Sequence, residues 1–375
     1  MQTDIQIETN KADLVTLAIG ARHLNPLVAA AGPESSIKIK LGYPQHTLAV
    51  EGKWGKGIVR IPNSNEAITP SDAFELSARQ LRLIERIPDD AAINYQTDAQ
   101  TIFMKLGTAE IQLSSTPVPL PYLSPLDGHA EIKGVDPISL RQALDFCLPF
   151  STKKTADSAA AVLHFSGPYV AVNNTQLGGA AAHGRGLEAL PQLRLNRGAA
   201  KRLSAVLTHM SNSITLYLTD STFVVTDEQS TFEFYRSEGE PLKIAKALEK
   251  AKANGPQIPG PKLEFIRPLH GAVPRPRSQE RATTSIASNQ DNGTLSFISV
   301  NNFKRKDMAT TIFKVATDRT WERLIDTDAL LLMPFPPTQM VTVAPTKVSD
   351  RNLLYVEYMI EEMHFCALFD TPKAL

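Results

Sequence analysis

The sequence contains few cysteines and no long apolar run. Its two cysteines, Cys147 and Cys366, lie far apart in apolar stretches. This usage is typical of a reducing compartment and predicts buried thiols rather than a disulfide. No apolar run reaches the roughly 18 residues of a membrane-spanning helix, and the polar, acidic start Met1–Glu8 does not have the pattern of a secretory signal. We therefore expect a cytoplasmic protein with no membrane partner.

An excess of charge of either sign is also absent. The 39 Lys and Arg residues balance the 39 Asp and Glu residues, so the formal net charge is zero. This balance excludes a protein that is basic over its whole surface, but it allows a locally basic surface that binds nucleic acid.

The sequence lacks the motifs of common enzymes and metal sites. The segment Gly255–Lys262 is spaced like a phosphate-binding loop, but Pro261 precedes the lysine and no Ser or Thr follows it. The eight histidines show no metal-ligand spacing, and no Gly-x-Ser-x-Gly motif occurs. The segment His183–Gly186 is predicted to be a flexible polar loop. We expect no cofactor, no metal and no catalytic residue.

What the sequence does contain is one pattern that occurs twice. A helix is predicted over Ala78–Ile87, and three short strands follow it within residues 93–113. A second helix is predicted over Gly198–Leu207, and three short strands follow it within residues 214–234. A repeat of this size predicts a duplicated domain.

The remaining segments extend this pattern to three domains. A helix over Asn10–Leu27 and strands within residues 37–61 precede the first repeat, and the proline-rich stretch Pro117–Pro125 predicts an extended connector after it. The strand pattern returns within residues 294–369. We therefore expect an α+β protein, with domains at residues 1–129, 130–240 and 241–375. The last domain is expected to contain a linker and a mobile segment at about residues 254–292.

The second domain is predicted to open with a helix that runs to about Leu148, with Asp136 as its N-cap and Pro137 in its first turn. Strands at 161–165 and 169–172 are expected next, followed by a Gly- and Ala-rich excursion at 178–188. The helical spacing assigns three residues to the buried face of the helix: Leu140, Leu144 and Cys147.

The two repeated helices each carry a basic face. Such a face is usually only solvated, but two equivalent basic helices in a neutral chain favour a positive lining for DNA phosphates. The candidate DNA-binding residues are Arg79, Arg82 and Arg86 on the first helix, Arg197 and Lys201 on the second, where Ser204 and Thr208 share the face, and Lys153 and Lys154 after the helix that opens the second domain.

The strand Glu110–Leu113 alternates polar and apolar residues. It is either an ordinary half-buried strand or a sheet edge that pairs with another subunit. In the second case, the apolar residues Ile111 and Leu113 would lie in the subunit interface.

With these residues in view, the chain resembles the bacterial DNA sliding clamp, the beta subunit of DNA polymerase III. The resemblance covers most of the length, and five segments carry it best: Leu76–Leu81, Ile87–Asp90, Gly107–Leu113, Tyr169–Leu177 and Leu195–Gly198. The family's loop usually reads Ala-Thr-Asp-Gly-x-Arg-Leu-Ala. This chain has Asn173, Asn174 and Gln176 where that loop has Asp, Gly and Arg, and Ala367–Asp370 stands in place of the family's Met-Pro tail.

The resemblance implies a head-to-tail ring dimer of three similar domains per chain, each with helices packed on antiparallel sheets. Helices would line a hole around double-stranded DNA, and Ile111 and Leu113 would meet a strand of the partner's third domain. DNA polymerase and the clamp loader would dock through short linear peptides.

The family's peptide pocket maps onto residues of the second domain, its end and the C-terminal strand. The matching positions are Val172, Thr175, Gln176, Leu177, Pro241, Leu368 and Phe369. These residues form either a peptide pocket of altered specificity or only a closed domain interface.

Three functions follow from the sequence. The first is a non-catalytic processivity factor that encircles DNA and tethers replication or repair proteins. The second is a clamp-like monomer that regulates a replisome as an interaction module, which a monomeric mass in solution would favour. The third is a DNA-processing enzyme with an unrecognised metal site, which metal-dependent turnover of DNA would favour.

Overall fold

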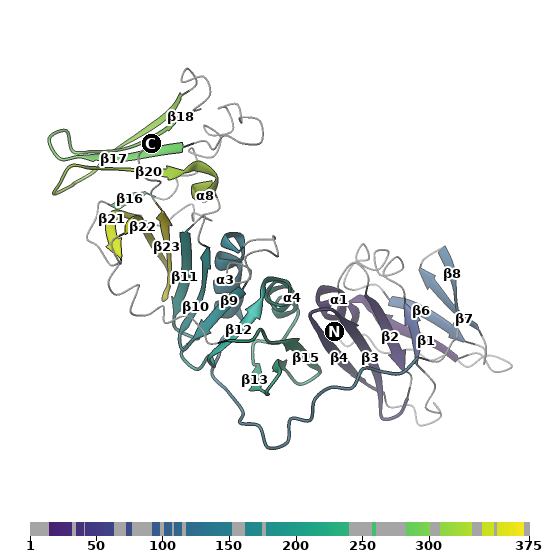
Figure 1. The fold of residues 1–375 in the computed structure, drawn as a ribbon. Helices are drawn as coiled ribbons and strands as arrows, with labels where there is room; N and C mark the ends of the chain where they lie inside the picture. Colours follow the sequence, from purple (N-terminus) through teal and green to yellow (C-terminus); the bar gives the residue numbers. More distant parts are fainter. Residues whose placement is uncertain are drawn as a thin grey trace. The chain divides into compact units, whose positions relative to one another are not determined.

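Antiparallel sheets dominate the computed structural model (Figure 1). Its contacts divide the chain into two compact units, residues 1–141 with 198–236 and residues 142–197 with 237–375. The structure describes residues 15–31, 35–40, 42–63, 73–76, 92–97, 101–106, 109–114, 118–151, 162–174, 178–239, 257–259, 283–300, 308–331, 340–348 and 351–370.

The first unit contains two antiparallel sheets. The larger has the order β13-β14-β15-β4-β3-β2-β5, and the smaller has the order β1-β6-β7-β8. The larger sheet comprises β2 (Ser36–Lys40), β3 (Gln45–Gly52), β4 (Gly55–Pro62), β5 (Phe74–Leu76), β13 (Thr215–Leu218), β14 (Thr222–Thr226) and β15 (Ser230–Tyr235). The smaller comprises β1 (Val15–Gly20), β6 (Ala92–Thr97), β7 (Thr101–Leu106) and β8 (Ala109–Ser114). Helix α1 spans Ala21–Ala30, and α4 spans Arg197–Leu207.

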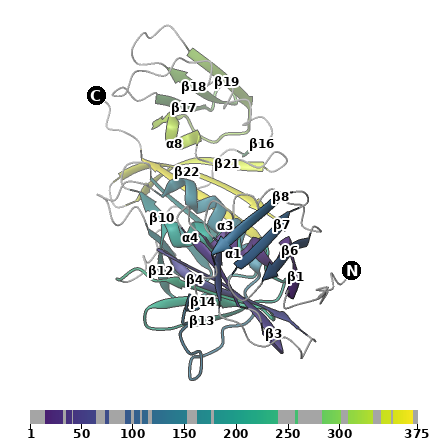
Figure 2. The same cartoon turned by 90° about the vertical axis from the view of Figure 1, so that its right-hand side faces the viewer.

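The second unit repeats this plan. Its larger sheet has the order β12-β9-β10-β11-β23-β22-β21-β16, and its smaller sheet has the order β19-β18-β17-β20, in which β17, β18 and β19 lie side by side (Figure 2). The larger sheet comprises β9 (Val162–Ser166), β10 (Tyr169–Asn174), β11 (Gly178–Gly184), β12 (Leu193–Asn196), β16 (Gln257–Pro259), β21 (Met340–Val348), β22 (Arg351–Ile360) and β23 (Met363–Asp370). The smaller comprises β17 (Thr283–Asn289), β18 (Thr294–Val300), β19 (Met308–Lys314) and β20 (Trp321–Asp326). The helices are α3 (Pro137–Cys147), the short 3-10 helix η1 (Leu148–Phe150) and α8 (Thr327–Leu331).

Helix α3 begins where its sequence predicts and packs on one face of the larger sheet. The Asp136 carboxylate accepts a 2.7 Å hydrogen bond from the Ser139 N–H, as an N-cap does. Aromatic rings fill the interface, because the Phe146 ring lies 5.2 Å from Phe365 and the Phe150 ring lies 6.0 Å from Phe369. The residues assigned to its buried face, Leu140, Leu144 and Cys147, are fully buried.

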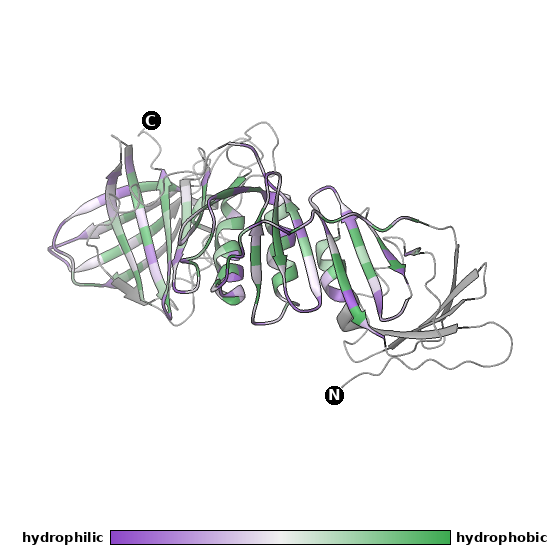
Figure 3. Ribbon diagram, turned by 90° about the horizontal axis from the view of Figure 1, so that it is seen from below, coloured by the Kyte–Doolittle hydropathy of each residue, from purple (hydrophilic) through white to green (hydrophobic). Residues whose placement is uncertain are grey.

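Hydrophobic residues recur along the strands and on the helices that cover them (Figure 3). Both cysteines are buried and unbridged, as the sequence predicts. Among the residues that the structure describes, no helix is long and apolar enough to cross a membrane.

Each larger sheet is joined by a strand pair between segments far apart in the sequence. In the β4–β15 junction, Gly55 pairs with Phe234 and Val59 with Ser230. In the β11–β23 junction, Gly184 pairs with Met363. Each junction links segments on different sides of a predicted domain boundary, at residue 129 or residue 240.

Glycine permits the close approach of backbones at both junctions. A Cβ atom on Gly55 would lie 2.2 Å from the Glu233 carbonyl oxygen, and one on Gly184 would lie 2.2 Å from the Glu362 carbonyl oxygen. Gly184 also has a φ of +148°, which residues with a side chain rarely adopt. Larger residues at these two positions would push the paired strands apart.

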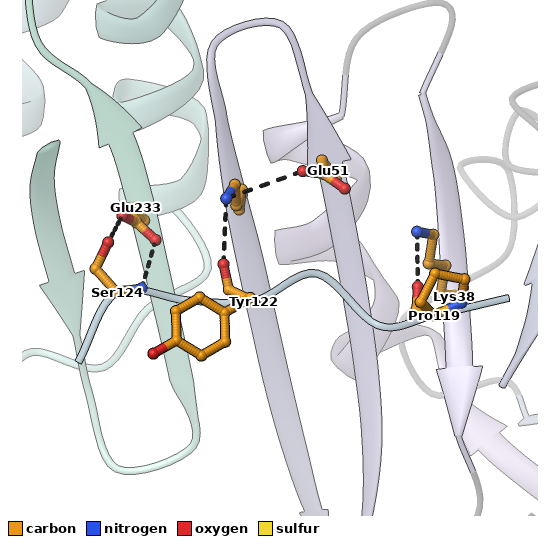
Figure 4. Close-up of polar contacts among 7 residues, drawn as sticks. Lys38, Glu51, Pro119, Tyr122, Ser124 and Glu233 are labelled. Atoms are coloured by element: carbon orange, nitrogen blue, oxygen red, sulfur yellow. Dashed lines mark hydrogen bonds and ion pairs between the residues drawn. The ribbon is translucent and has the colours of Figure 1, made fainter. Parts of the chain in front are cut away.

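The predicted proline-rich connector is extended where the structure describes it and runs across the larger sheet of the first unit. We call residues 118–133 the connector strap (Figure 4). Lys38 Nζ donates to the Pro119 carbonyl at 2.8 Å, and Lys56 Nζ donates to the Tyr122 carbonyl at 3.1 Å. Ser124 donates its N–H and its hydroxyl to the Glu233 carboxylate, at 3.2 and 2.5 Å. The strap therefore crosses the β4–β15 junction, because it is hydrogen-bonded to Lys56 of β4 and to Glu233 of β15.

Four predicted segments differ from the structure. Residues 15–20 of the expected first helix form β1, because their apolar spacing also suits a strand that pairs with β6. The Gly- and Ala-rich excursion contains β11, a central strand whose small side chains fit between two neighbours. The expected linker contains β16, and the expected mobile segment contains β17, whose alternate residues Thr284, Ile286 and Ser288 are buried.

The hydrogen bonds of the strap to Glu233 are expected to stabilise the first unit. Glu233 is 2% exposed, so the loss of a donor leaves a buried carboxylate oxygen short of a partner. Ser124→Ala should lower the free energy of unfolding by about 1–3 kcal/mol, measured by urea denaturation. Ser221→Ala, at an exposed position of the β13–β14 turn, is the control. Equal stabilities of the two variants would contradict this role of the strap.

Candidate functional site

Helix α4 presents one exposed basic residue opposite its apolar face. Leu203 and Val206 are fully buried, whereas Lys201 is exposed. Arg197 begins the helix, and its Nε donates a 2.8 Å hydrogen bond to the Ser151 hydroxyl. Ser204 is buried at 7% exposure and does not share the solvent-facing surface of Lys201. The exposed basic face of α4 is therefore narrower than its sequence predicts.

The other candidate DNA-binding residues lie outside the described residues. Arg79, Arg82 and Arg86 fall within residues 77–91, and Lys153 and Lys154 fall within residues 152–161. Their roles remain predictions from the sequence.

Two arginines that the sequence analysis did not single out lie on the described helices. Arg202 of α4 donates to the Ala29 carbonyl at 3.4 Å, and burial lowers the pKa of its guanidinium. It therefore links α4 to α1 rather than facing solvent. Arg141 lies on α3 between the buried Leu140 and Leu144 and is half-buried. Arg141 is the one cation on α3, and a single cation makes no repeated spacing by which the sequence could identify it.

The predicted edge strand lies at the end of its sheet. Within the described residues β8 pairs only with β7, with Ile111 opposite Met104 and Leu113 opposite Ile102. Strand β19 ends the smaller sheet of the second unit in the same way, and its Ile312 side chain is 61% exposed. In each unit, the smaller sheet therefore has an end strand that pairs on one side only with the strands that the structure describes.

The structure places the described candidates for the peptide pocket on two faces of one sheet. Phe369 is fully buried against Phe150, and Val172, which is 2% exposed, lies on the same face by strand alternation. Leu368 lies on the opposite face, where it is half-buried and packs against Tyr355 and Cys366. Of these three side chains, only Leu368 is accessible to a peptide. Thr175, Gln176, Leu177 and Pro241 lie outside the described residues.

A buried imidazole lies on that same face. His164 of β9 is 3% exposed and pairs with Arg194 of β12 and Ala171 of β10. Burial, and secondarily the positive charge of Arg194, lowers the pKa of His164 to about 4. The folded protein therefore keeps this ring neutral at pH 7.

Neither a protein-family model nor a curated protein matches the sequence. Solved structures match it over nearly its whole length. The beta subunit of DNA polymerase III from Pseudomonas aeruginosa aligns with a TM-score of 0.70 at 15% identity, covering 95% of this chain and 100% of that chain. The chain has the sliding-clamp fold.

Two further clamp structures agree with this assignment. The beta subunit of Thermotoga maritima gives a TM-score of 0.74 at 8% identity, and the beta sliding clamp of Caulobacter crescentus gives 0.72 at 12% identity. Each alignment covers 96% of this chain and 100% of the other. The resemblance in the sequence is confirmed at the level of the fold. At identities this low, the shared fold does not show that this chain binds the partners of those proteins. The partners of this chain are therefore inferred from its own residues.

The neutral His164 ring makes stability depend on pH. Its folded pKa, about 4, lies below the unfolded value of 6.5, so the unfolded chain binds an additional proton between these values. Stability should be complete above pH 6.5 and fall by about 1.4 kcal/mol per pH unit as the pH drops towards 4. Urea unfolding at several pH values measures this slope. His164→Gln should make it shallower, whereas His209→Gln, at an exposed position, should not. Equal slopes in both variants would contradict the assignment.

Proposed function

We propose that this protein is a DNA sliding clamp, a non-catalytic ring dimer that encircles double-stranded DNA and tethers a DNA polymerase. The single observation that carries this proposal is that β8 and β19 each pair on one side only among the described strands, in a chain with the clamp fold.

The strand order of the sheets supports closure by a second copy. Three groups of four strands share one arrangement. When the strands of a group are numbered in chain order, they lie side by side in the order fourth, first, second, third: β5-β2-β3-β4, β12-β9-β10-β11 and β20-β17-β18-β19. The sheets also contain three runs of consecutive strands, β6-β7-β8, β13-β14-β15 and β21-β22-β23. In two of the four-strand groups the third strand pairs with the last strand of such a run, as β4 does with β15 and β11 with β23. In the third group β19 has no such partner among the described strands, and β8 is the remaining last strand.

The β11–β23 junction provides a template for the pairing of β8 with β19. The pair Ile360–Met363 closes a two-residue turn before β23, and the pair Leu106–Ala109 has the same spacing in the sequence at the start of β8. Glu110 of β8 therefore corresponds to His364 of β23. On the other side of the junction, Tyr169 and Thr294 are each the first residue of the second strand in their group. Tyr169 pairs with His183 of β11 and Thr294 pairs with Lys314 of β19, so Lys314 corresponds to His183.

This correspondence gives a register for the subunit interface. It sets Glu110 of one protomer opposite Lys314 of the other, because the template pairs His364 with His183. It also sets Ile111 opposite Phe313, which is buried. Opposite charges and apolar pairs directly across two strands stabilise a sheet, so both faces of the proposed junction are complementary.

Diffuse contacts with phosphates would supply the affinity for DNA. Lys201 is the exposed cation of α4, and we assign it to the lining together with Arg197, Arg79, Arg82, Arg86, Lys153 and Lys154. Phosphate contacts carry no sequence information, which suits a ring that slides. We further propose that peptides of the polymerase and the clamp loader bind beside Leu368, with Leu177 and Pro241 as the other apolar anchors.

The charge pair in the proposed interface tests assembly and register together. Lys314→Glu places Glu opposite Glu110 and should shift the protein from dimer to monomer, measured by analytical ultracentrifugation. A double variant with Glu110→Lys and Lys314→Glu should restore the dimer. Glu322→Lys, on β20 at the other end of the same sheet, is the control and should remain dimeric. A wild-type protein that stays monomeric at all concentrations would instead favour a regulatory interaction module, and a dimer that tolerates Lys314→Glu would reject this register.

A further inference from the structure

Two histidines face each other across the β11–β23 junction. His183 of β11 and His364 of β23 are directly paired in the register of the two strands. Their rings are stacked, with centroids 4.7 Å apart and planes at 5°, and the Tyr169 ring lies 4.8 Å from His183 on the far side. Both histidines are only half-buried, so dissolved ions can reach them.

A carboxylate fixes the orientation of His364. The Nδ1 atom of His364 lies 3.2 Å from the Glu357 Oε1 atom. Because a carboxylate only accepts hydrogen bonds, Nδ1 carries the proton and the lone pair is on Nε2. This is the arrangement that carboxylates impose on histidines that bind metals.

A buried tyrosine holds Glu357 in turn. The Tyr355 side chain is hydrogen-bonded to Glu357, and burial raises the pKa of its hydroxyl well above the ordinary value. Tyr355 therefore stays protonated and donates to the carboxylate. Tyr355 is 2% exposed, so the series Tyr355–Glu357–His364 is anchored in the core of the sheet.

We propose that His183 and His364 form a two-histidine site for a divalent transition-metal ion of the Ni²⁺, Cu²⁺ or Zn²⁺ class. Directly paired residues have Cβ atoms about 4.5–5.5 Å apart, and zinc–nitrogen bonds, for example, are about 2.0–2.1 Å long. Because nitrogen lone pairs lie in the ring planes, the stacked rings do not point at one position, and metal binding requires one ring to turn about its terminal torsion, which is soft in histidine. Water completes the coordination.

The composition of the site sets its selectivity. Imidazole nitrogen prefers Cu²⁺, Ni²⁺ and Zn²⁺, whereas Mg²⁺ prefers oxygen ligands. Within the described part of the chain, no group of three or more His, Cys, Asp and Glu residues is arranged to hold a metal. Two imidazoles are therefore the only protein ligands that we assign.

Metal binding would strengthen the junction. The two ligands belong to strands separated by most of the second unit's sequence, and an ion bound to both ties β11 to β23. A ligand that binds only the folded state raises stability in proportion to the logarithm of its concentration above Kd. This inference does not depend on DNA binding or on ring formation.

Calorimetric titration of the full chain with NiCl₂ at pH 7.5 tests the site. We expect one Ni²⁺ per chain, no saturable binding of Mg²⁺, and a rise in the thermal unfolding midpoint with Ni²⁺. His183→Gln should abolish that rise, and Glu357→Gln should weaken Ni²⁺ binding by about tenfold. His209→Gln, at an exposed position outside the junction, is the matched control and should bind like the wild type.

A second measurement needs no variant at the site. Addition of Ni²⁺ to the wild type should perturb the NMR signals of the His183 and His364 rings at lower Ni²⁺ concentrations than those of the other histidines. Three results would each overturn the proposal: equal Ni²⁺ affinity in wild type and His183→Gln, absence of saturable binding, or perturbation of other histidine rings at lower Ni²⁺ concentrations than this pair.

Discussion

Antiparallel pairing between distant segments is the interaction on which this structure depends. The β4–β15 and β11–β23 junctions turn short strand groups into continuous sheets. Backbone N–H and C=O groups are costly to leave unpaired, and end strands that offer them are sites of association. The same constraint therefore applies to β8 and β19, and in the proposed dimer a second copy of the chain would satisfy it by the pairing that already occurs twice within one copy.

The local features of this fold could be predicted from the sequence. The N-cap Asp136 and the spacing of Leu140, Leu144 and Cys147 place α3 correctly, because capping and amphipathic spacing act over a few residues. The alternation of Glu110–Leu113 likewise predicts strand β8, but it leaves open whether that strand lies at the end of its sheet. Buried free cysteines also follow from the sequence, since both lie in apolar segments.

Features that depend on distant partners could not be predicted in this way. Strand β11 consists largely of Gly and Ala, and it becomes a strand because β10 and β23 pair on its two sides. The sequence pattern predicts a loop at His183, and only the register with β23 brings this residue against His364. The two sides of the sheet also separate Phe369 from Leu368, although they are neighbours in the predicted peptide pocket.

Topological retention tests most directly whether the protein surrounds DNA. A chain with Glu110→Cys and Lys314→Cys, joined across the proposed interface by a short thiol cross-linker in the presence of nicked circular DNA, should form a closed ring; the native cysteines are buried and do not compete. The closed ring should stay on circular DNA in 1 M salt, where charges more than about 3 Å apart are largely screened, and it should leave when the DNA is linearised. Equal loss from circular and linear DNA in high salt would contradict the account.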